Sequence, residues 1–445
     1  MSHDFKGRLF RRGEPGYEDA RGAAVWRANK PDRFPEAIVV AESDMDVQAA
    51  VRLAEAENLK IGVRSGGHSW VSPHIRDGSL LIDLSRLQRL DIDVESRSAW
   101  VDAGVKGRRV NDELTAHDLM VPTGHHNTVG CGGFLMCGGF GWNFRQWGTG
   151  SANVTAIELV TAEGELIQAD ATQNQDYFWA ARGGGSGYFG VVLRFRVNAY
   201  PRPAFLRSNG YVFPLEVMEE ALTWFFDMCR KAPQYVELVG TGLAADPQGN
   251  PVSPRLSVSG LTFAQTEEEA LAVKALFDTC PVKDRAISRR DNEPTTLELR
   301  YEGATAVDPE GFRYAVDNRY TDAEAADIVP LMRELIETMP THRTHVFVLH
   351  QGARPNMDGM ALSAWGENYV AAYPIWEDPS QDEDMERWVV DQMARFDGVA
   401  NGEGQMNDEN MRVRHVAYLS PENAAKLEML RDRYDPEKRF VSFLR

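Results

Sequence analysis

The sequence predicts an α+β protein of two domains that share a groove. Its 445 residues exceed the ~250–300 residues at which a single hydrophobic core stops growing. Up to residue 200, short strands alternate with helices and glycine-rich turns, a pattern typical of a mixed α and β domain. After Pro201 and Pro203 the pattern changes to longer helices and alternating strands, so we expect a second domain to begin there.

The first domain opens, after an irregular start, with a strand at residues 37–40. Ser43 is placed to cap the helix that follows, whose apolar residues recur at helical spacing up to Asn58. A second strand at residues 60–64 runs into a glycine-rich turn. We expect further strands at 80–84, 98–103, 156–160, 166–169 and 191–197, and a helix at 110–117.

The second domain is predicted to contain long helices and alternating strands. The helices are expected at 215–231 and 267–279, and the strands at 255–261 and 345–351. Near the end of the chain a helix at 421–434 is closed by Asp435-Pro436, because proline disfavours helical backbone in the residue before it.

Composition excludes several classes of protein. Hydrophobic residues make up 43% and charged residues 26%, the balance of a packed soluble protein. The net charge of −18 opposes binding to nucleic acid or to an anionic membrane. No apolar run approaches the ~20 residues of a membrane span, and the first residues lack the apolar stretch of a signal peptide, so we expect a cytoplasmic protein. Four cysteines are too few for a disulfide scaffold, and we expect free thiols.

Glycine is concentrated in three segments, at 64–69, 124–153 and 178–192. In the first, two glycines between Ser65 and His68 would present consecutive backbone N–H groups to a pyrophosphate. The second is dense enough for its backbone to lie against a flat ring or phosphates. The third contains GxGxxG, but a strand follows where a Rossmann fingerprint requires a helix, so an NAD site of that type is disfavoured. The sequence has no GxxxxGK[ST] motif, and ATP or GTP hydrolysis has no support.

Taken together, four motifs resemble those of the FAD-linked oxidase family with a PCMH-type FAD-binding domain, and more narrowly its berberine-bridge-enzyme-like branch. The motifs are R-S-G-G-H at 64–68, T-V-G-x-G-G to G-G-x-G at 128–141, W-A-x-R-G-x-G at 179–185, and R-x-x-Y-D-P-x-x-x-F at 431–440. The resemblance implies an α+β fold in which a two-part FAD-binding domain carries an inserted substrate domain, built on an antiparallel sheet flanked by helices. The implied boundaries are 1–203 and 405–445 for the FAD-binding domain and 204–404 for the substrate domain.

The resemblance also implies a covalent bond between His68 and FAD. In that family the histidine of the Gly-Gly-His motif bonds through a ring nitrogen to the flavin 8α-methyl group, a link that raises the flavin potential and prevents cofactor loss. Many members add a second bond from a cysteine, whose position is taken here by His126. We therefore expect a single attachment, as in the bacterial 6-hydroxy-D-nicotine-oxidase-like members.

Cys131 occupies the position that in some relatives decides whether dioxygen reaches the flavin. A small side chain there is compatible with an oxidase, although a free cysteine is usually a small buried hydrophobe. A redox pair of Cys131 with Cys137 is less favoured than two inert thiols. The full set of residues expected to bind the cofactor is Arg64, Ser65, Gly66, Gly67, His68, Ser69, Gly124, His126, Thr128, Gly130, Cys131, Gly133, Gly138, Gly141, Asn153, Gly190, Val192 and Asn407.

Substrate contacts are expected from the inserted sheet, in particular from the strand at 345–351. Its alternation places Phe347, Leu349 and Gln351 on one face and His350 on the other. The first face would imply an apolar or aromatic substrate, and the second would offer His350 as its polar group. No metal is expected, because the spacing of the neighbouring histidines divides them between the two faces. Hydride transfer also needs a base, and the candidates, among which the sequence does not choose, are His350, Tyr418, Tyr373, Glu367 and Gln351.

These observations favour an oxidase that dehydrogenates a CH–OH or CH–NH group of a small, aromatic or alkaloid-like molecule and passes the electrons to O2, giving H2O2. An oxidative cyclase or oxygenase of a natural-product pathway, a dehydrogenase with another acceptor, and a flavin-containing binding protein without turnover are the alternatives. A small-molecule substrate and O2 are the expected partners, with neither nucleic acid nor membrane. A homo-oligomer is left open.

Overall fold

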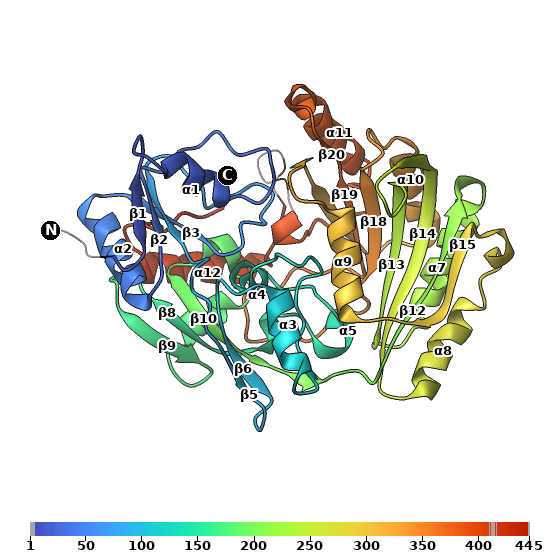
Figure 1. The fold of residues 1–445 in the computed structure, drawn as a ribbon, viewed down its shortest axis with the longest axis horizontal. Helices are drawn as coiled ribbons and strands as arrows, with labels where there is room; N and C mark the ends of the chain where they lie inside the picture. Colours follow the sequence, from blue (N-terminus) through green and yellow to red (C-terminus); the bar gives the residue numbers. More distant parts are fainter. Residues whose placement is uncertain (1–4, 409, 411–413, 415, 444–445) are drawn as a thin grey trace.

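The structure, a computed structural model, describes residues 5–408, 410, 414 and 416–443. Figure 1 shows two lobes side by side, with the first lobe built from the N-terminal part of the chain and from helix α12 (Pro421–Tyr434). The middle of the chain forms the second lobe. The predicted α+β fold with an inserted antiparallel sheet is confirmed.

The first lobe contains a four-stranded sheet with the order β1-β2-β4-β3. Its strands are β1 (Arg8–Arg11), β2 (Ala37–Val40), β3 (Lys60–Arg64) and β4 (Ser79–Asp83). Helix α2 (Asp44–Ala56) links β2 to β3, and Ser43 caps it by accepting a hydrogen bond from the Asp46 backbone N–H. This strand, helix, strand unit ends at Arg64, which places the glycine-rich turn after β3 at the end of a buried sheet.

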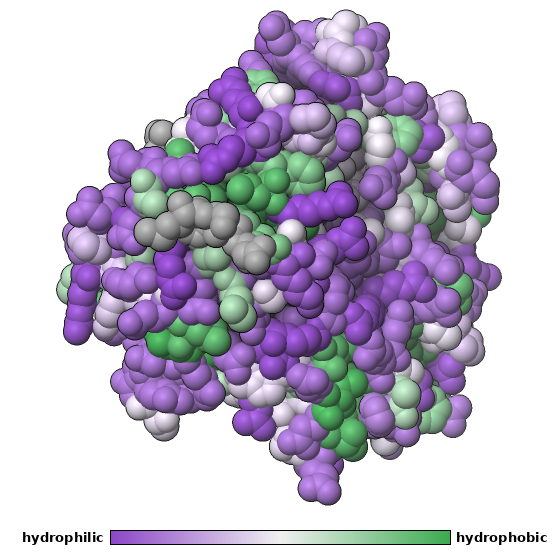
Figure 2. All heavy atoms as spheres, turned by 60° about the vertical axis from the view of Figure 1, so that its left-hand side comes forward, coloured by the Kyte–Doolittle hydropathy of each residue, from purple (hydrophilic) through white to green (hydrophobic). Residues whose placement is uncertain are grey.

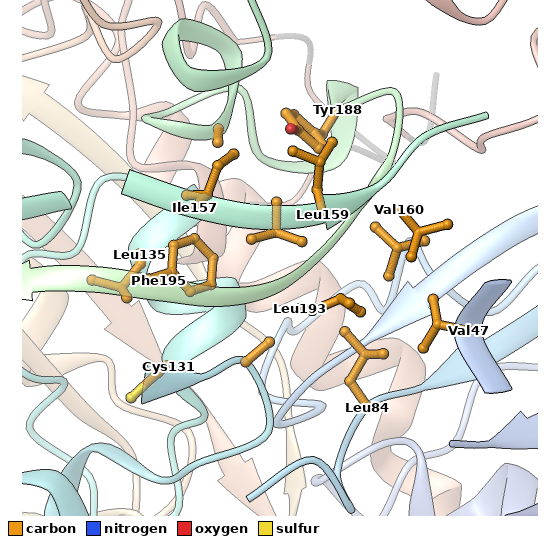
Figure 3. Packing of buried hydrophobic residues seen from close by; sticks show 14 of the residues in the cluster. Val47, Leu84, Cys131, Leu135, Ile157, Leu159, Val160, Tyr188, Leu193 and Phe195 are labelled. Atoms are coloured by element: carbon orange, nitrogen blue, oxygen red, sulfur yellow. The ribbon is translucent and has the colours of Figure 1, made fainter. Parts of the chain in front are cut away.

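A second, five-stranded antiparallel sheet completes the first lobe, with the order β5-β6-β10-β8-β9. Figure 3 shows Ile157 and Leu159 of β8 together with Leu193 and Phe195 of β10 in the buried core of this lobe. The strands are β5 (Leu90–Asp93), β6 (Ser98–Asp102), β8 (Val154–Val160), β9 (Leu166–Asp170) and β10 (Val191–Asn198). The remaining elements are α1 (Tyr17–Ala23), α3 (Gly107–Thr115), β7 (Leu119–Met120), α4 (Cys131–Met136), α5 (Phe144–Trp147), η1 (Ser151–Asn153), α6 (Gln175–Ala181), η2 (Gly185–Gly187) and β11 (Tyr200–Pro201).

The second lobe is built on a seven-stranded antiparallel sheet with the order β15-β12-β14-β13-β18-β19-β17. Its strands are β12 (Phe205–Pro214), β13 (Val236–Ala245), β14 (Pro251–Ala264), β15 (Ser288–Pro294), β17 (Asp317–Thr321), β18 (His345–His350) and β19 (Asn368–Tyr373). Helices α7 (Met218–Cys229), α8 (Glu267–Phe277), α10 (Ala325–Glu337) and α11 (Asp382–Ala394) bury an apolar core against one face. The other face is free to meet the first lobe. Shorter elements are α9 (Leu297–Val307), β16 (Arg313–Tyr314), β20 (Ile375–Trp376) and the 3-10 turns η3 (Leu215–Val217), η4 (Lys283–Arg285), η5 (Pro379–Gln381) and η6 (Met406–Asp408).

The C-terminal segment returns to the first lobe and pairs with β3. The Ile61 backbone N–H donates to Arg439 O at 2.8 Å, and the Val441 N–H donates to Ile61 O at 2.9 Å. Arg431 of α12 is 3% exposed and donates to the carbonyl oxygens of Gly187 at 2.9 Å and Phe440 at 3.0 Å. The chain end is thereby fixed beside the glycine-rich turn.

The surface is predominantly polar. On the face drawn in Figure 2, hydrophilic side chains cover most of the surface and hydrophobic ones gather in small separate groups. Within the described ranges, the helices are all too short or too polar to cross a membrane.

Candidate cofactor and substrate site

A cavity of about 470 Å³ lies between the two lobes. Its walls come from the loop after β3, from the glycine-rich stretch around α4, from the open face of the seven-stranded sheet and from the C-terminal return. The site therefore depends on segments that are up to several hundred residues apart in the sequence.

The loop after β3 offers backbone N–H groups to a ligand. Among the described residues, the N–H groups of Gly66, Gly67 and His68 have no hydrogen-bond partner within the chain. Gly67 has φ +76°, a left-handed conformation that glycine adopts without strain. Arg64 fixes the base of the loop through two hydrogen bonds to Asp83, at 2.8 and 2.9 Å. Consecutive free N–H groups in such a turn are typical of an anion-binding nest.

A chain of hydrogen bonds fixes the tautomer of His68. His126 Nε2 donates to the backbone carbonyl of Asp308 at 3.1 Å, so the other ring nitrogen of neutral His126 is an acceptor. Thr128 donates its hydroxyl to His126 Nδ1 at 2.9 Å. Its Oγ1 can then only accept at 2.8 Å from His68 Nε2, which must carry the proton. The lone pair of His68 therefore lies on Nδ1.

Burial keeps both histidines neutral. It lowers the pKa of His68 well below its usual value, with the nearby His126 as a smaller cause, and lowers the pKa of His126 to about 4. Trp26 stacks on His68 with ring centroids 4.8 Å apart. A neutral imidazole with a free lone pair, held by stacking and a hydrogen bond, is a competent nucleophile.

Glycines around α4 keep the cavity open for a cofactor. A Cβ on Gly66 would approach Gly130 N to 2.6 Å, so the two loops can pack together only without side chains. Gly133 lines the cavity, and a Cβ there would meet nothing within 4 Å, so it leaves free space. The free N–H groups, the neutral His68 and this open backbone fit a dinucleotide with a flat ring system.

The sheet supplies an aromatic wall opposite the glycine-rich loops. Val239, Phe347, Leu349, Tyr369 and Tyr373 line the cavity. This result decides between the two faces of β18, because Phe347 and Leu349 face the cavity.

His350 points to the opposite side of β18. Its Nδ1 lies 3.1 Å from Asn368 Oδ1, and burial lowers its pKa to about 4. It cannot reach the cavity from there.

Asp408 forms the polar centre of this wall. Its carboxylate accepts hydrogen bonds from Trp70 Nε1 at 2.8 Å, Tyr369 Oη at 3.0 Å and Gln405 Nε2 at 2.8 Å. Burial raises the pKa of Asp408, although the donors from Trp70 and Tyr369 oppose the shift. Tyr373 Oη lies 3.3 Å from Tyr369 Oη, and burial raises the pKa of Tyr373 well above its usual value.

Two further acids line the same cavity. Asp308 has a pKa raised to about 7 by burial and by the charge of Asp408. Glu237 of β13 is 6% exposed and accepts from His125 Nε2 at 2.8 Å. Burial alone would lower the pKa of His125, but the adjacent Glu237 carboxylate raises it.

Most residues predicted to bind the cofactor line this cavity, and some do not. Those that do are Arg64, Ser65, Gly66, Gly67, His68, Ser69, Gly124, His126, Gly130, Gly133, Gly190, Val192 and Asn407. Thr128 does not line the cavity, but its hydroxyl is hydrogen-bonded to His68. Gly138 and Gly141 shape the turn after α4, where Gly138 has φ +106° and a Cβ on Gly141 would lie 2.1 Å from Thr123 O. Asn153 donates to the carbonyl oxygens of Trp147 and Thr149, both at 2.9 Å, and braces that turn from behind.

Cys131 faces the protein interior and not this cavity. Figure 3 shows it at the edge of the first core, in the same cluster as Leu135 and Phe195. Burial raises the pKa of its thiol to about 12. The structure therefore favours the interpretation of Cys131 as a small buried hydrophobe.

Of the five candidates for the base, Tyr373 alone lines the cavity. Gln351 and Glu367 lie at the end of β18, where the Gln351 N–H donates to Glu367 O at 2.8 Å. Tyr418 packs with Cys137 and Met406 beside the cavity wall.

The sequence did not single out Trp26, Trp70, His125, Glu237, Asp308 or Asp408, although all of them line the cavity. Asp408 directly follows the predicted Asn407, and His125 precedes His126. Glu237 carried a further signal, because it is the acidic residue in an otherwise apolar and small-residue strand, β13.

Comparison with known proteins supports an FAD-binding fold. The family described as FAD binding domain matches residues 35–170. FAD-linked oxidoreductase nodO of Hypoxylon pulicicidum is 28% identical over 431 residues, which cover 95% of this chain and 93% of that protein. Berberine bridge enzyme-like 24 of Arabidopsis thaliana is 37% identical over 166 residues, or 35% of this chain and 30% of that protein. The crystal structure of 6-hydroxy-D-nicotine oxidase from Arthrobacter nicotinovorans has the same fold, with a TM-score of 0.84 at 22% identity over 98% of this chain and 97% of that one.

The fold and these comparisons define the class of the protein, which is an FAD-linked oxidoreductase with a PCMH-type FAD-binding domain. Within that class the chain is similar to berberine-bridge-enzyme-like proteins, in agreement with the resemblance seen in its motifs.

Proposed function

We propose that the protein is an FAD-dependent oxidase that dehydrogenates a CH–OH or CH–NH group of a small aromatic or alkaloid-like molecule. One observation carries the proposal. A single cavity joins the free N–H groups and His68 at one side to the aromatic and acidic face of the sheet at the other. Bound FAD would accept the hydride and pass two electrons to O2, which leaves as H2O2.

We further propose that FAD is attached through Nδ1 of His68 alone. The hydrogen bonds that link His68, Thr128 and His126 support Nδ1 as the point of attachment, because they leave the lone pair of His68 on Nδ1. His126 stands where a second attachment would need a thiolate, and an imidazole engaged at both nitrogens is not available as a nucleophile.

The substrate proton would leave through Tyr373. The hydroxyl of Tyr373 lies next to that of Tyr369, which donates to Asp408. A substrate O–H or N–H that donates to Tyr373 can therefore lose its proton along two hydroxyls to a buried carboxylate. The raised pKa of Asp408 makes it a better proton acceptor near neutral pH.

Anaerobic bleaching of the flavin by a panel of aromatic alcohols and amines tests the activity. We expect at least one compound to bleach the flavin, and O2 to restore the colour with formation of H2O2. Reoxidation by quinones or dyes but not by O2 would identify a dehydrogenase. A product with a new ring or an added oxygen atom would favour the cyclase or oxygenase alternative, and a flavin that no compound bleaches would favour a binding protein.

Acid precipitation tests the attachment. Wild-type protein should keep its yellow colour in the precipitate, and His68→Ala should release it. His117→Ala, which changes an exposed histidine of the first lobe, is the matched control and should retain the colour. Colour retained by His68→Ala would disprove the attachment site.

A further inference from the structure

The acidic groups of the cavity outnumber the cations that could neutralise them. Glu237, Asp308 and Asp408 line it. Arg64 also lines it but is engaged by Asp83 through two hydrogen bonds. Arg145, near the start of β13, donates to backbone carbonyl oxygens of Pro233 and Val236 and does not line the cavity. His125 donates a hydrogen bond to Glu237, and Arg145 interacts with Glu237 through its charge without a hydrogen bond to it in the described part of the chain.

Glu237 has an oxygen atom without a partner. Its Oε1 accepts from His125, but its Oε2 is buried and has no hydrogen bond in the described part of the chain. The side chain lies on the same face of β13 as Val239, and both residues line the cavity. A buried carboxylate oxygen without a donor is costly unless a ligand supplies the missing interaction.

Asp308, on another wall of the cavity, also has a buried carboxylate oxygen without a hydrogen-bond partner among the described residues. Its Oδ1 is buried and accepts no hydrogen bond from the described residues, and His345 Nε2 lies 3.7 Å away. His345 is buried, and burial lowers its pKa to about 3, so its ring carries no charge that would satisfy the acid. Two of the three acids thus have one buried oxygen without a donor among the described residues, whereas Asp408 accepts three hydrogen bonds.

Aromatic side chains form the remaining walls around these acids. Trp70 and Tyr373 meet edge to face with centroids 5.7 Å apart, and Phe347 stacks on Tyr373 at 5.4 Å. Aromatic faces together with carboxylates attract organic cations through cation–π and ionic interactions.

We propose that the substrate carries a positively charged nitrogen, and that Glu237 binds this nitrogen in the field of Asp308 and Asp408. The inference rests on the proposed oxidase function and narrows its substrate class to cationic amines with an apolar body. The charged nitrogen is a recognition group and can be separate from the C–H bond that is oxidised.

Equilibrium binding to the flavin-loaded protein tests this inference without turnover. The probes are benzyltrimethylammonium and its uncharged isostere 2,2-dimethylpropylbenzene, and the readout is the perturbation of the flavin absorption spectrum. We expect the cation to bind about tenfold or more tightly than the isostere, because a desolvated carboxylate is left unpaired by the neutral compound.

Glu237→Gln should abolish this preference while FAD stays bound. Glu293→Gln removes the same charge from an exposed position of the same sheet and should keep the preference. Equal affinities of the two probes in the wild type, or a preference that survives Glu237→Gln, would overturn the proposal. If Glu237→Gln did not fold, Asp308→Asn should weaken cation binding in its place, and an unchanged preference would again overturn it.

The test of cation binding and the test of the oxidase activity can fail independently of each other. An enzyme that is bleached only by neutral alcohols and shows no cation preference would refute the inference and leave the oxidase standing. A protein that binds the cation but is bleached by no substrate would refute the oxidase alone.

Discussion

At the scale of single residues, the reactive state of His68 is set by side chains behind it. Thr128 is the link between the two histidines, because its hydroxyl donates to His126 and accepts from His68. Without that acceptor, the proton of His68 could move to Nδ1 and occupy the lone pair that the proposed bond requires.

Thr128→Val should therefore impair covalent attachment more than FAD binding. Valine keeps the shape of threonine but neither donates nor accepts. We expect most of the flavin to be released on acid denaturation, and native protein to remain yellow. Flavin fluorescence in a denaturing gel measures the attached fraction, with Thr155→Val at an exposed position of β8 as control. Full attachment in Thr128→Val would show that His68 does not depend on this hydrogen bond.

Tyr373→Phe tests the proposed proton route. Phenylalanine retains the stacking on Phe347 and His345 but lacks the hydroxyl next to Tyr369. The rate constant for anaerobic flavin reduction should fall by about 10²- to 10⁴-fold, the usual contribution of a positioned proton acceptor. The flavin content should be unchanged. A reduction rate equal to that of the wild type would exclude Tyr373 from the route.

The affinity for a cationic ligand should rise with pH between 6 and 8. The raised pKa of Asp308, about 7, means that this acid is largely neutral below that pH and negatively charged above it. His125, whose pKa is also raised, loses its positive charge as the pH rises through that pKa. Both changes make the cavity more negative, and the neighbours His345 and Asp408 do not oppose them.

The dissociation constant of benzyltrimethylammonium, measured at several pH values, checks this dependence. Asp308→Asn should show a weaker dependence on pH, because the variant lacks the carboxyl group whose pKa is raised to about 7. An affinity that falls as the pH rises, or a dependence unaltered in the variant, would contradict the assignment.

At the scale of elements, the sequence predicted where most helices and strands lie and missed several that depend on tertiary contacts. The helix at 421–434 and the strands at 37–40 and 60–64 agree with the structure because local patterns define them. The helix α4 lies within the stretch expected to be glycine-rich loop. Its Gly132 packs against Ser65 of the loop after β3, and its Gly133 faces the cavity.

The candidate site shows the same difference between features that local sequence patterns define and features that tertiary contacts define. Motifs such as R-S-G-G-H predicted loops that line the cavity, because a ligand constrains consecutive residues in such a loop. The substrate wall was only partly predictable, because Asp408 meets Trp70 across 338 positions of sequence. Such contacts are set by how the two lobes close, and no local pattern encodes them.

Helix α12 shows how one element supports the site without lining it. Arg431 holds the terminal segment by donating to Gly187, Tyr188 and Phe440, all on or near the cavity wall. Arg431→Ala should lower the free energy of unfolding by about 3 kcal/mol, because buried acceptors lose a charged donor.

Flavin content should fall with this stability, and thermal unfolding followed by circular dichroism measures the loss. Arg433→Ala, at an exposed position of the same helix, should change little. Equal effects of the two substitutions would indicate that the buried hydrogen bonds contribute nothing specific.

At the scale of the whole molecule, each lobe has its own hydrophobic core, and the core of the second lobe lies on the face of its sheet that points away from the cavity. One core includes β8, β10 and α12, and the other includes α7, α10 and the inner residues of the large sheet. Residues of both lobes line the cavity, so a cofactor lodged there would contact both. We therefore expect bound FAD to contribute to the stability of both lobes.

The covalent attachment at His68 should make the stabilisation by FAD independent of the concentration of free FAD. A ligand that binds only the folded state stabilises it by an amount that grows with its concentration, about 2.7 kcal/mol at a hundredfold excess over Kd. In the wild type the bound flavin cannot dissociate, so added FAD should not change the apparent unfolding temperature. In His68→Ala that temperature should be lower without added FAD and should rise by a few degrees as FAD is added.

Differential scanning fluorimetry at one fixed heating rate measures both unfolding temperatures, with His117→Ala expected to behave as the wild type. A wild-type unfolding temperature that rises with added FAD would show that the cofactor is held without a covalent bond, and the role proposed for His68 would then be wrong.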